Sequence, residues 1–262
     1  MLNFACVNNA AIGIYDSGMG GLTIRRAVRQ RLPRESIVYL GDGKHCPYGS
    51  RSVEEIARLA DEAVGHLIAL GCKLIVVACN TATAAAIDRL REKYAPLPIV
   101  GMEPAIKPAC LRTKSRVVGV LATERSLDGE LFRRTAAKYG ADIEVITRAG
   151  RGFVELVEHD EEQSEEAVRI VGEAIHPMLE RGADQIVLGC THYPFLLEAL
   201  QRAAAGRAVT FVDPSEAVAR RVEQLLDAHD LACEADHEAE DRFVTFADEH
   251  YRLRLEQKAK QY

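Results

Sequence analysis

The sequence has no tryptophan, few aromatic residues (6%) and no excess of positive charge, with 33 lysines and arginines against 39 acidic residues. The net charge of −6 argues against nucleic-acid binding as the main task, because phosphate contacts usually rest on a basic surface. The scattered aromatic residues also offer no platform on which bases could stack. We therefore expect no direct nucleic-acid partner.

Long apolar runs are missing as well. The longest compact one covers only 74–79, far short of the roughly 20 residues that a membrane-spanning helix needs. Residues 1–10 contain no lysine or arginine and no long apolar core, so they do not resemble a secretory signal. We expect a soluble, cytoplasmic protein without membrane contact.

The seven cysteines are an odd, scattered set without the density of a disulfide scaffold and without a Cys-x-x-Cys pair. This pattern predicts free thiols and excludes the usual dithiol redox site. His229, Cys233 and His237 have helix-like spacing for zinc, but they lie in an acidic, alanine-rich stretch at 227–241, which is more typical of a solvated loop. We expect no metal. The cysteines are Cys6, Cys46, Cys72, Cys79, Cys110, Cys190 and Cys233.

Short apolar, β-branched runs alternate with longer amphipathic stretches along the whole chain. The runs are mostly continuous, as expected for strands that are covered on both faces. This alternation predicts an α/β fold of parallel sheets with helices outside. The expected strands are 11–16, 36–42, 73–79, 98–102, 116–122, 142–147, 184–189, 208–213 and 242–246. The expected helices include 52–70, 81–94, 127–139, 164–181, 194–204 and 215–229, and glycines at 71 and 182 end two of them.

Nine strands suit two sheets better than one. A proline-rich break at 94–98 and a second break around 207–213 predict a discontinuous first domain, 1–99 plus 209–262, and a second domain at 100–208. One internal similarity supports two related domains, because 71–79 aligns without gaps on 182–190. In both segments a helix ends in glycine, a strand follows, and a cysteine ends the strand.

The two cysteine turns carry the chemistry that we expect. Cys79 and Cys190 each follow a strand, at the edge where open parallel sheets bind ligands. Each precedes small polar residues and then a helix, whose positive end favours the thiolate. Asn80, Thr81 and Thr191 suit helix capping and hydrogen bonds to a ligand carboxylate.

A matched pair of thiols suits the inversion of a stereocentre. One base removes the α-proton and a conjugate acid returns a proton from the opposite face, so the two groups start in opposite protonation states and end exchanged. Thiols titrate close enough to neutral pH to occupy either state. An enzyme with a nucleophilic cysteine needs one thiol and one histidine base, so it would give the second cysteine no role. A zinc site would need more ligands with local spacing.

The glycines at 18, 20 and 21 give a rival interpretation. They follow a predicted strand, and Asp42 ends the next one, as in a dinucleotide-binding fingerprint. Thr23 stands where that fingerprint needs its third glycine. We favour a tight turn whose backbone amides are free to bind an anion, and we expect no cofactor.

In order along the chain, five motifs resemble those of the glutamate racemase family within the aspartate/glutamate racemase superfamily, and the resemblance covers about 12–246. They are Asp-Ser-Gly-Met-Gly-Gly-Leu-Thr at 16–23, Pro-Tyr-Gly at 47–49, Ala-Cys-Asn-Thr at 78–81, Gly-Met-Glu-Pro-Ala-Ile-Lys-Pro at 101–108 and Gly-Cys-Thr-His-Tyr-Pro at 189–194.

The resemblance implies a cofactor-independent isomerase that interconverts L- and D-glutamate and supplies D-glutamate for peptidoglycan synthesis. It also implies two α/β domains with the active site in the cleft between them, and a homodimer. By motif, Cys79 acts on D-glutamate and Cys190 on L-glutamate as the two proton donors and acceptors. The implied substrate contacts are Asp16, Ser17, Tyr48, Gly49, Asn80, Thr81, Thr191 and His192.

Three further positions resemble family elements. Thr123 and Ser126 stand near a Gly-x-x-x-Thr-x-x-Thr element that often binds the γ-carboxylate, and Glu158 matches an auxiliary acid. Two other functions stay open: racemisation of another amino acid with the same thiol pair, and a non-catalytic binding protein that has kept the fold. Comparing glutamate with aspartate as substrates tests the first alternative. Replacing the two cysteines with serine tests the second.

Overall fold

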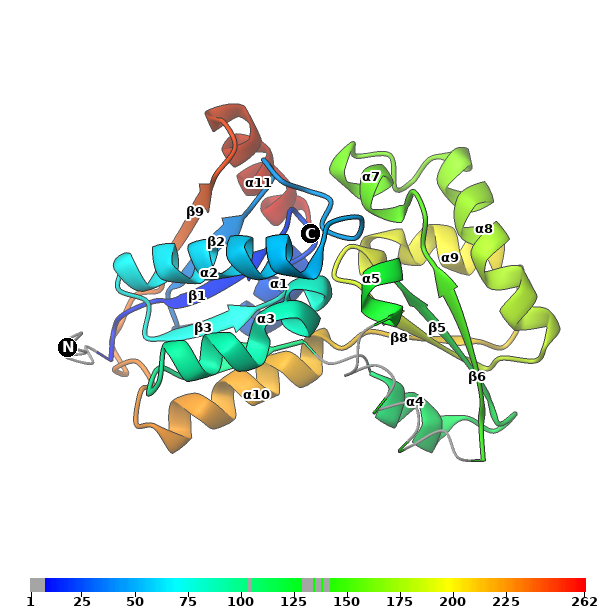
Figure 1. The fold of residues 1–262 in the computed structure, drawn as a ribbon, viewed down its shortest axis with the longest axis horizontal. Coiled ribbons are helices and arrows are strands. Elements are labelled where there is room, and N and C mark those ends of the chain that lie inside the picture. Colours follow the sequence, from blue (N-terminus) through cyan, green and yellow to red (C-terminus); the bar gives the residue numbers. More distant parts are fainter. Residues whose placement is uncertain (1–7, 103–104, 129–133, 135–137, 139–141) are drawn as a thin grey trace. The chain divides into compact units, whose positions relative to one another are not determined.

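The computed structural model describes residues 8–102, 105–128, 134, 138 and 142–262, and they form two compact units (Figure 1). The first unit runs up to Cys46 and continues through Ser52–Met102 and Ser215–Tyr262. The second comprises Pro47–Arg51 and Glu103–Pro214. The predicted division into a discontinuous first domain, 1–99 plus 209–262, and a second domain at 100–208 stays a prediction.

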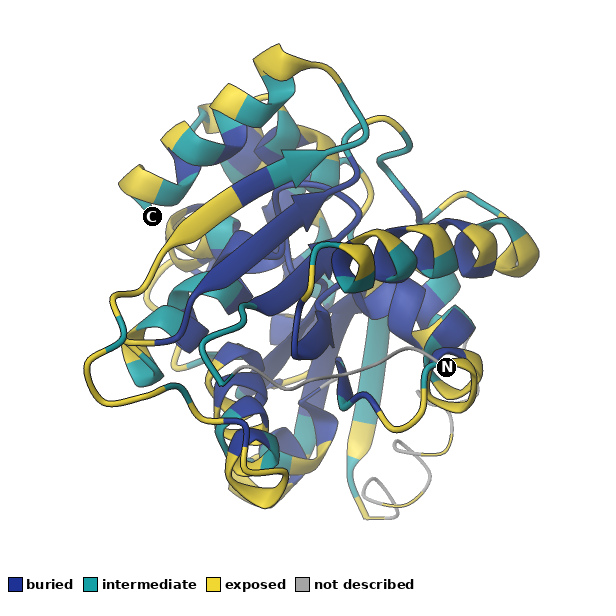
Figure 2. Ribbon diagram, turned by 90° about the vertical axis from the view of Figure 1, so that its left-hand side faces the viewer, coloured by how far each residue is buried: buried dark blue, intermediate teal, exposed yellow. Residues whose placement is uncertain are grey.

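The first unit is built on a parallel sheet of five strands in the order β4-β3-β1-β2-β9. Every residue of β1, β2 and β3 is buried, which explains their continuous apolar sequences. Figure 2 shows these buried strands in dark blue and the outer faces of the surrounding helices in yellow. The strands are β1 (Ile12–Asp16), β2 (Ile37–Gly41), β3 (Leu74–Val77), β4 (Ile99–Gly101) and β9 (Asp241–Thr245). The helices are α1 (Leu22–Arg31), α2 (Val53–Ala69), α3 (Asn80–Lys93), α10 (Ser215–Ala228) and α11 (Glu249–Gln261).

The second unit has a parallel sheet of four strands in the order β6-β5-β7-β8. Its core packs α7, α8 and α9 against this sheet around Phe153, Met178 and Tyr193. The strands are β5 (Val117–Ala122), β6 (Glu144–Ala149), β7 (Gln185–Gly189) and β8 (Thr210–Val212). The helices are α4 (Ile106–Arg112), α5 (Glu124–Leu127), α7 (Phe153–Glu158), α8 (Glu165–Glu180), a 3₁₀ turn η1 (Tyr193–Leu196) and α9 (Leu197–Ala203).

The two sheets repeat one topology. The order β4-β3-β1-β2 in the first unit has the same pattern as β8-β7-β5-β6 in the second. Strand β3 therefore corresponds to β7, and the two cysteine turns follow equivalent strands. This correspondence gives the sequence similarity between 71–79 and 182–190 a structural basis.

The predicted α/β fold of two parallel sheets is confirmed, and all nine predicted strands are present. Gly71 and Gly182 adopt left-handed φ angles of 83° and 86° just after α2 and α8, as expected of residues that end helices. The predicted helix at 194–204 instead begins as the 3₁₀ turn η1. Most of the predicted helix 127–139, residues 103–104 of the fourth motif and Cys6 lie outside the described residues.

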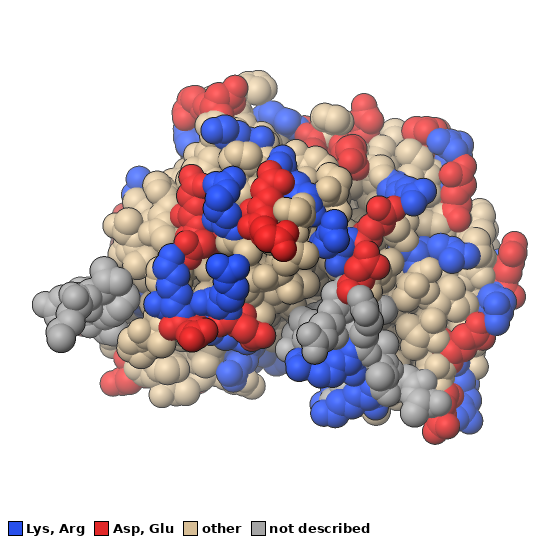
Figure 3. Space-filling view, viewed as in Figure 1, with Lys and Arg blue, Asp and Glu red and all other residues tan. Residues whose placement is uncertain are grey.

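Acidic and basic side chains are interspersed over the face shown in Figure 3. Within the described residues, no helix has both the length and the apolar character to cross a membrane.

Candidate active site

The predicted site residues gather in two groups, one in each unit, at the carboxyl ends of the strands. In the first unit, Asp16 ends β1 and is fully buried, and its Oδ1 accepts a hydrogen bond from the amide of Gly18 at 2.9 Å. Ser17 follows, and its Oγ accepts a hydrogen bond from the Cys79 thiol at 3.5 Å. The ends of β1 and β3 thus bring a carboxylate, a hydroxyl and a thiol to the same edge.

Cys79 is itself the residue that caps α3. Its Sγ accepts a hydrogen bond from the amide of Ala82 at 3.5 Å, in the geometry of an N-cap. Asn80 and Thr81 lie inside the first turn, so the expectation that they cap the helix is corrected. The amide and the positive end of the helix both stabilise a negative charge on sulfur, and they therefore favour the thiolate.

The side chain of Asn80 is 5% exposed, yet neither its Nδ2 nor its Oδ1 has a hydrogen-bond partner among the described residues. A buried primary amide without partners costs free energy, about 1–3 kcal/mol per unsatisfied group. Such a group is explained if it binds a ligand with both donor and acceptor atoms. Asn80 and Cys79 are adjacent, so this ligand would meet the thiol.

Gly21 makes the close packing of this edge possible. A Cβ atom there would lie 2.6 Å from Cβ of Asp16 and 3.2 Å from Cβ of Ala78. Only glycine therefore fits between the loop after β1 and the turn after β3. This requirement explains the glycine at the start of α1 without a dinucleotide.

In the second unit, Cys190, His192 and Glu158 form a connected series. Cys190 follows β7 and its Sγ lies 3.8 Å from Nδ1 of His192. Nε2 of the same ring lies 2.7 Å from Oε1 of Glu158, at the end of α7. His192 is 1% exposed, so solvent does not compete for the ring. When Nε2–H donates to Glu158, the Nδ1 lone pair faces the thiol and can accept its proton.

Tyr193 directly follows His192 in the chain and is held in place by its own contacts. Its ring packs edge-on against Phe153 with 4.9 Å between centroids, and its hydroxyl donates to the carbonyl of Gly150 at 3.4 Å. Burial, and after it the negative charge of a Cys190 thiolate, raise the pKa of Tyr193. Tyr193 therefore stays neutral and serves as a rigid support for the turn at 190–192. Thr191 is also buried in this turn.

Tyr48 and Gly49 belong to the second unit, although the chain just before them, up to Cys46, belongs to the first. Tyr48 is 2% exposed, and a Cβ atom at Gly49 would lie 3.4 Å from Cβ of Thr123. Thr123 caps α5 by accepting from the amide of Ser126 at 3.2 Å, and the two hydroxyl oxygens lie 2.9 Å apart. Pro-Tyr-Gly and the Thr123–Ser126 pair are thus neighbours, which sequence analysis did not foresee.

The remaining described cysteines are also free thiols. Burial, partly offset by Arg242, raises the pKa of Cys72 to about 12, and burial raises that of Cys110. Both are packing residues. The stretch at 227–241 contains the residues with zinc-like spacing. There, Nε2 of His237 lies 2.9 Å from Oγ of Ser36, and the amide of Cys233 donates to Glu35.

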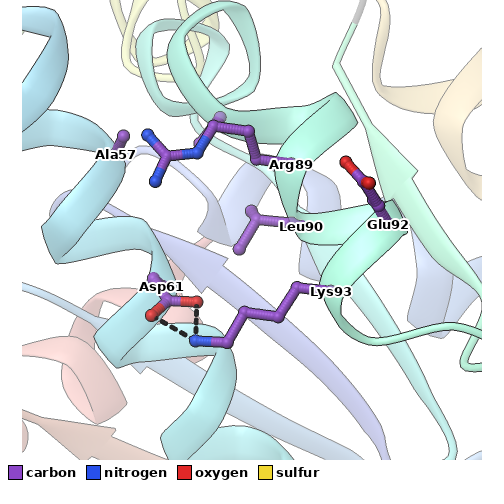
Figure 4. A pocket seen from close by; sticks show the side chains of 7 residues that line it. Ala57, Asp61, Arg89, Leu90, Glu92 and Lys93 are labelled. Atoms are coloured by element: carbon purple, nitrogen blue, oxygen red, sulfur yellow. Dashed lines mark hydrogen bonds and ion pairs between the residues drawn. The ribbon is translucent and has the colours of Figure 1, made fainter.

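One cavity of the first unit lies apart from this edge. It has a volume of about 370 Å³ and opens between α2 and α3, where Lys93 forms an ion pair with Asp61 (Figure 4). Arg89 points toward Ala57 across the same opening (Figure 4). None of the predicted site residues lines the cavity, so it is not the candidate active site.

Comparison with known proteins decides the family. The model of the Asp/Glu/Hydantoin racemase family matches residues 22–222. The chain belongs to this family. It is therefore an enzyme, an isomerase of the racemase type, and the resemblance inferred from the five motifs is confirmed.

Individual members of the family support this assignment. The chain is 50% identical over 220 residues to the glutamate racemase of Herpetosiphon aurantiacus, covering 84% of this chain and 86% of the relative. Its fold matches the crystal structure of glutamate racemase isoform RacE1 from Bacillus anthracis with a TM-score of 0.85, 30% identity and coverage of 97% and 95%. The D-glutamate complex of glutamate racemase from Francisella tularensis matches with a TM-score of 0.83, 28% identity and coverage of 98% and 95%.

Proposed function

We propose that this racemase interconverts L- and D-glutamate with two cysteine bases and no cofactor. The observation that carries the proposal is the pair of thiols at equivalent strand ends, one after β3 and one after β7. Curated relatives at 40–50% identity are named glutamate racemase, and the Francisella tularensis structure holds D-glutamate. Both support glutamate as the substrate.

In the proposed mechanism, the Cys190 thiolate takes the α-proton of L-glutamate, and the electron pair of the broken C–H bond is left on Cα. The Cys79 thiol then donates its proton to the opposite face, giving D-glutamate and a Cys79 thiolate. The reverse direction starts from the Cys79 thiolate and the Cys190 thiol. The amide of Ala82 and the end of α3 stabilise the thiolate on Cys79, and His192 accepts the proton that Cys190 must release before it acts on L-glutamate.

Substrate binding follows from the polar groups beside each thiol. We assign the unpartnered amide of Asn80 to the substrate, with Thr81, Thr191 and Ser17 as further hydrogen-bonding groups. Asp16 is a buried carboxylate suited to the substrate ammonium, and fixed donors on the carboxylate stabilise the carbanion. Tyr48, Gly49, Thr123 and Ser126 lie together and are assigned to the side-chain end of the substrate.

The biological role belongs to the same proposal. The product D-glutamate would supply peptidoglycan synthesis. We place the enzyme in the cytoplasm and expect it to act as a homodimer. The proposed chemistry uses side chains of the chain itself, so we expect activity to survive treatment with a chelator.

Glutamate is expected to be the preferred substrate over aspartate, which is one methylene shorter. A pocket that fits one chain length discriminates against a missing methylene by roughly 10–200-fold in kcat/KM. The measurement is the loss of optical rotation with L-glutamate, D-glutamate, L-aspartate and D-aspartate on reduced protein. Equal or better turnover of aspartate, or no turnover of glutamate by folded protein, would contradict the proposal.

A further inference from the structure

The C-terminal helix α11 packs directly on the backbone turn that follows β2. A Cβ atom at Gly43 would lie 2.4 Å from both Cε1 and Cζ of Tyr251, so the outer end of the tyrosine ring lies directly against the glycine. Gly43 does not have a positive φ, so a side chain there would meet this ring and displace it without straining the backbone. At Gly41, a Cβ atom would lie 3.1 Å from Cδ1 of Leu255 on the same helix.

The turn beneath α11 is bonded to the candidate active site. The amide of Asp42 donates to the carbonyl of Asp16 at 3.0 Å, which joins the ends of β1 and β2. A Cβ atom at Gly41 would lie 2.8 Å from the carbonyl oxygen of Gly18, whose amide in turn donates to the Asp16 carboxylate at 2.9 Å. Contacts therefore run without interruption from the Tyr251 ring to Asp16.

A titratable pair lies on this turn. The carboxylate of Asp42 is fully buried, and its two oxygens lie 2.9 and 3.0 Å from Nδ1 of His45. Gly43 stands between the two residues of the pair. Movement of Gly43 would displace both of them together with the Asp42 amide that holds Asp16.

Helix α11 is anchored so that it can hold the turn. Asp248 caps its first turn by accepting from the Tyr251 amide at 2.9 Å, and Leu255 is fully buried. At its other end, the Tyr262 ring lies 3.9 Å from the guanidinium of Arg26 on α1. The helix follows β9 at the carboxyl end of the first sheet (Figure 1). It is therefore fixed at its start, its middle and its end.

We infer that Tyr251 is a positioning residue of the racemase: its ring holds the Gly43 turn and, through it, the Asp16 end of β1 beside Cys79. The expected effect of Tyr251 on turnover rests on the proposed function. The expected effect of Tyr251 on the reactivity of the Cys79 thiol does not. Small misplacements of binding groups are costly, about 10²-fold in rate for 1 Å.

The test compares Tyr251→Ala with Tyr251→Phe and with Leu253→Ala, a half-exposed position on the same helix. We expect kcat to fall about 10–100-fold in Tyr251→Ala, to fall less in Tyr251→Phe, which keeps the ring, and to stay within about twofold in Leu253→Ala. The rate of Cys79 alkylation by iodoacetamide, measured by peptide mass, should change in Tyr251→Ala, while that of Cys190 does not. Thermal unfolding midpoints show that each variant is folded.

A second pair of variants tests the contact if Tyr251→Ala alone does not fold. In Gly43→Ala the new methyl group pushes the Tyr251 ring away from the turn. This variant should show the same loss of kcat and the same change in the rate of Cys79 alkylation as Tyr251→Ala. The double variant Gly43→Ala/Tyr251→Ala should lose no more kcat than either single variant, because the space left by the ring accepts the new methyl group. Fully additive losses would overturn the inference.

Two other results would also overturn it. One is an unchanged kcat and an unchanged Cys79 alkylation rate in Tyr251→Ala. The other is an equal change at both cysteines with a lowered unfolding midpoint, which would show general loosening. If the unaltered protein does not racemise glutamate, the proposed function fails, and the alkylation rates alone decide on Tyr251.

Discussion

Replacing Cys79 or Cys190 with serine is expected to abolish racemisation and to leave the fold intact. Each thiol is required in every turnover, in one direction as base and in the other as acid. A serine hydroxyl occupies nearly the same space but is far less acidic than a thiol, so its anion is not populated near neutral pH. General acid–base groups contribute about 10²–10⁴-fold, and we expect a loss of at least about 10³-fold in kcat for either variant.

The chain provides matched controls for this prediction. Cys233→Ser in the first unit and Cys110→Ser in the second replace free thiols that lie away from the two turns. Both controls should keep kcat within about twofold, which is the expectation for positions outside the two cysteine turns. Circular dichroism spectra and unfolding midpoints check the fold of all four variants. Near-normal activity in Cys79→Ser or Cys190→Ser would rule out the two-base mechanism.

Replacing Glu158 with glutamine is expected to lower kcat by roughly 10²-fold, because the carboxylate orients His192 toward Cys190. Glutamine keeps a hydrogen-bonding oxygen but loses the charge that stabilises a protonated imidazole. The defect should be confined to proton transfer at Cys190. Glu161→Gln is the control, since Glu161 is an exposed acid just beyond α7.

The isotope effect of the α-deuterium locates this defect. In Glu158→Gln, the isotope effect on kcat should fall toward one with α-deuterated L-glutamate, because transfer of the Cys190 proton to His192, and not cleavage of the Cα–H bond, then limits turnover. With α-deuterated D-glutamate it should stay close to that of the unaltered protein, because that direction starts from the Cys190 thiol. Equal changes with both enantiomers would show that Glu158 acts on the whole enzyme instead of on Cys190.

Much of the fold was predictable because the strands are buried on both faces. Continuous apolar runs such as 74–79 admit few other interpretations, and glycines 71 and 182 mark the helix ends through their left-handed conformation. Helix α4 was missed because it has only seven residues and contains Pro108. Helix α11 was missed because it buries only Leu255 and Lys258, which leaves no apolar stripe in its sequence.

The candidate site was predictable where its residues are neighbours in sequence. The cysteine turns and the residues that follow them form short motifs, and their structural equivalence follows from the repeated topology. The bond between His192 and Glu158 joins residues 34 positions apart, and the contact between Gly43 and Tyr251 joins residues on different elements. Burial of the Asn80 amide without partners is equally invisible in sequence, because it depends on packing from several segments.

The most direct test of the central claim is the reaction of chelator-treated, reduced protein with L-glutamate in deuterated water, stopped at low conversion. The account predicts that newly formed D-glutamate carries deuterium at Cα, while the remaining L-glutamate keeps its proton, because one thiol removes the proton and the other delivers a solvent-derived one. Deuterium appearing in the unconverted L-glutamate as fast as in the product would indicate a single base. Such a result, or a D-product without deuterium, would contradict the account.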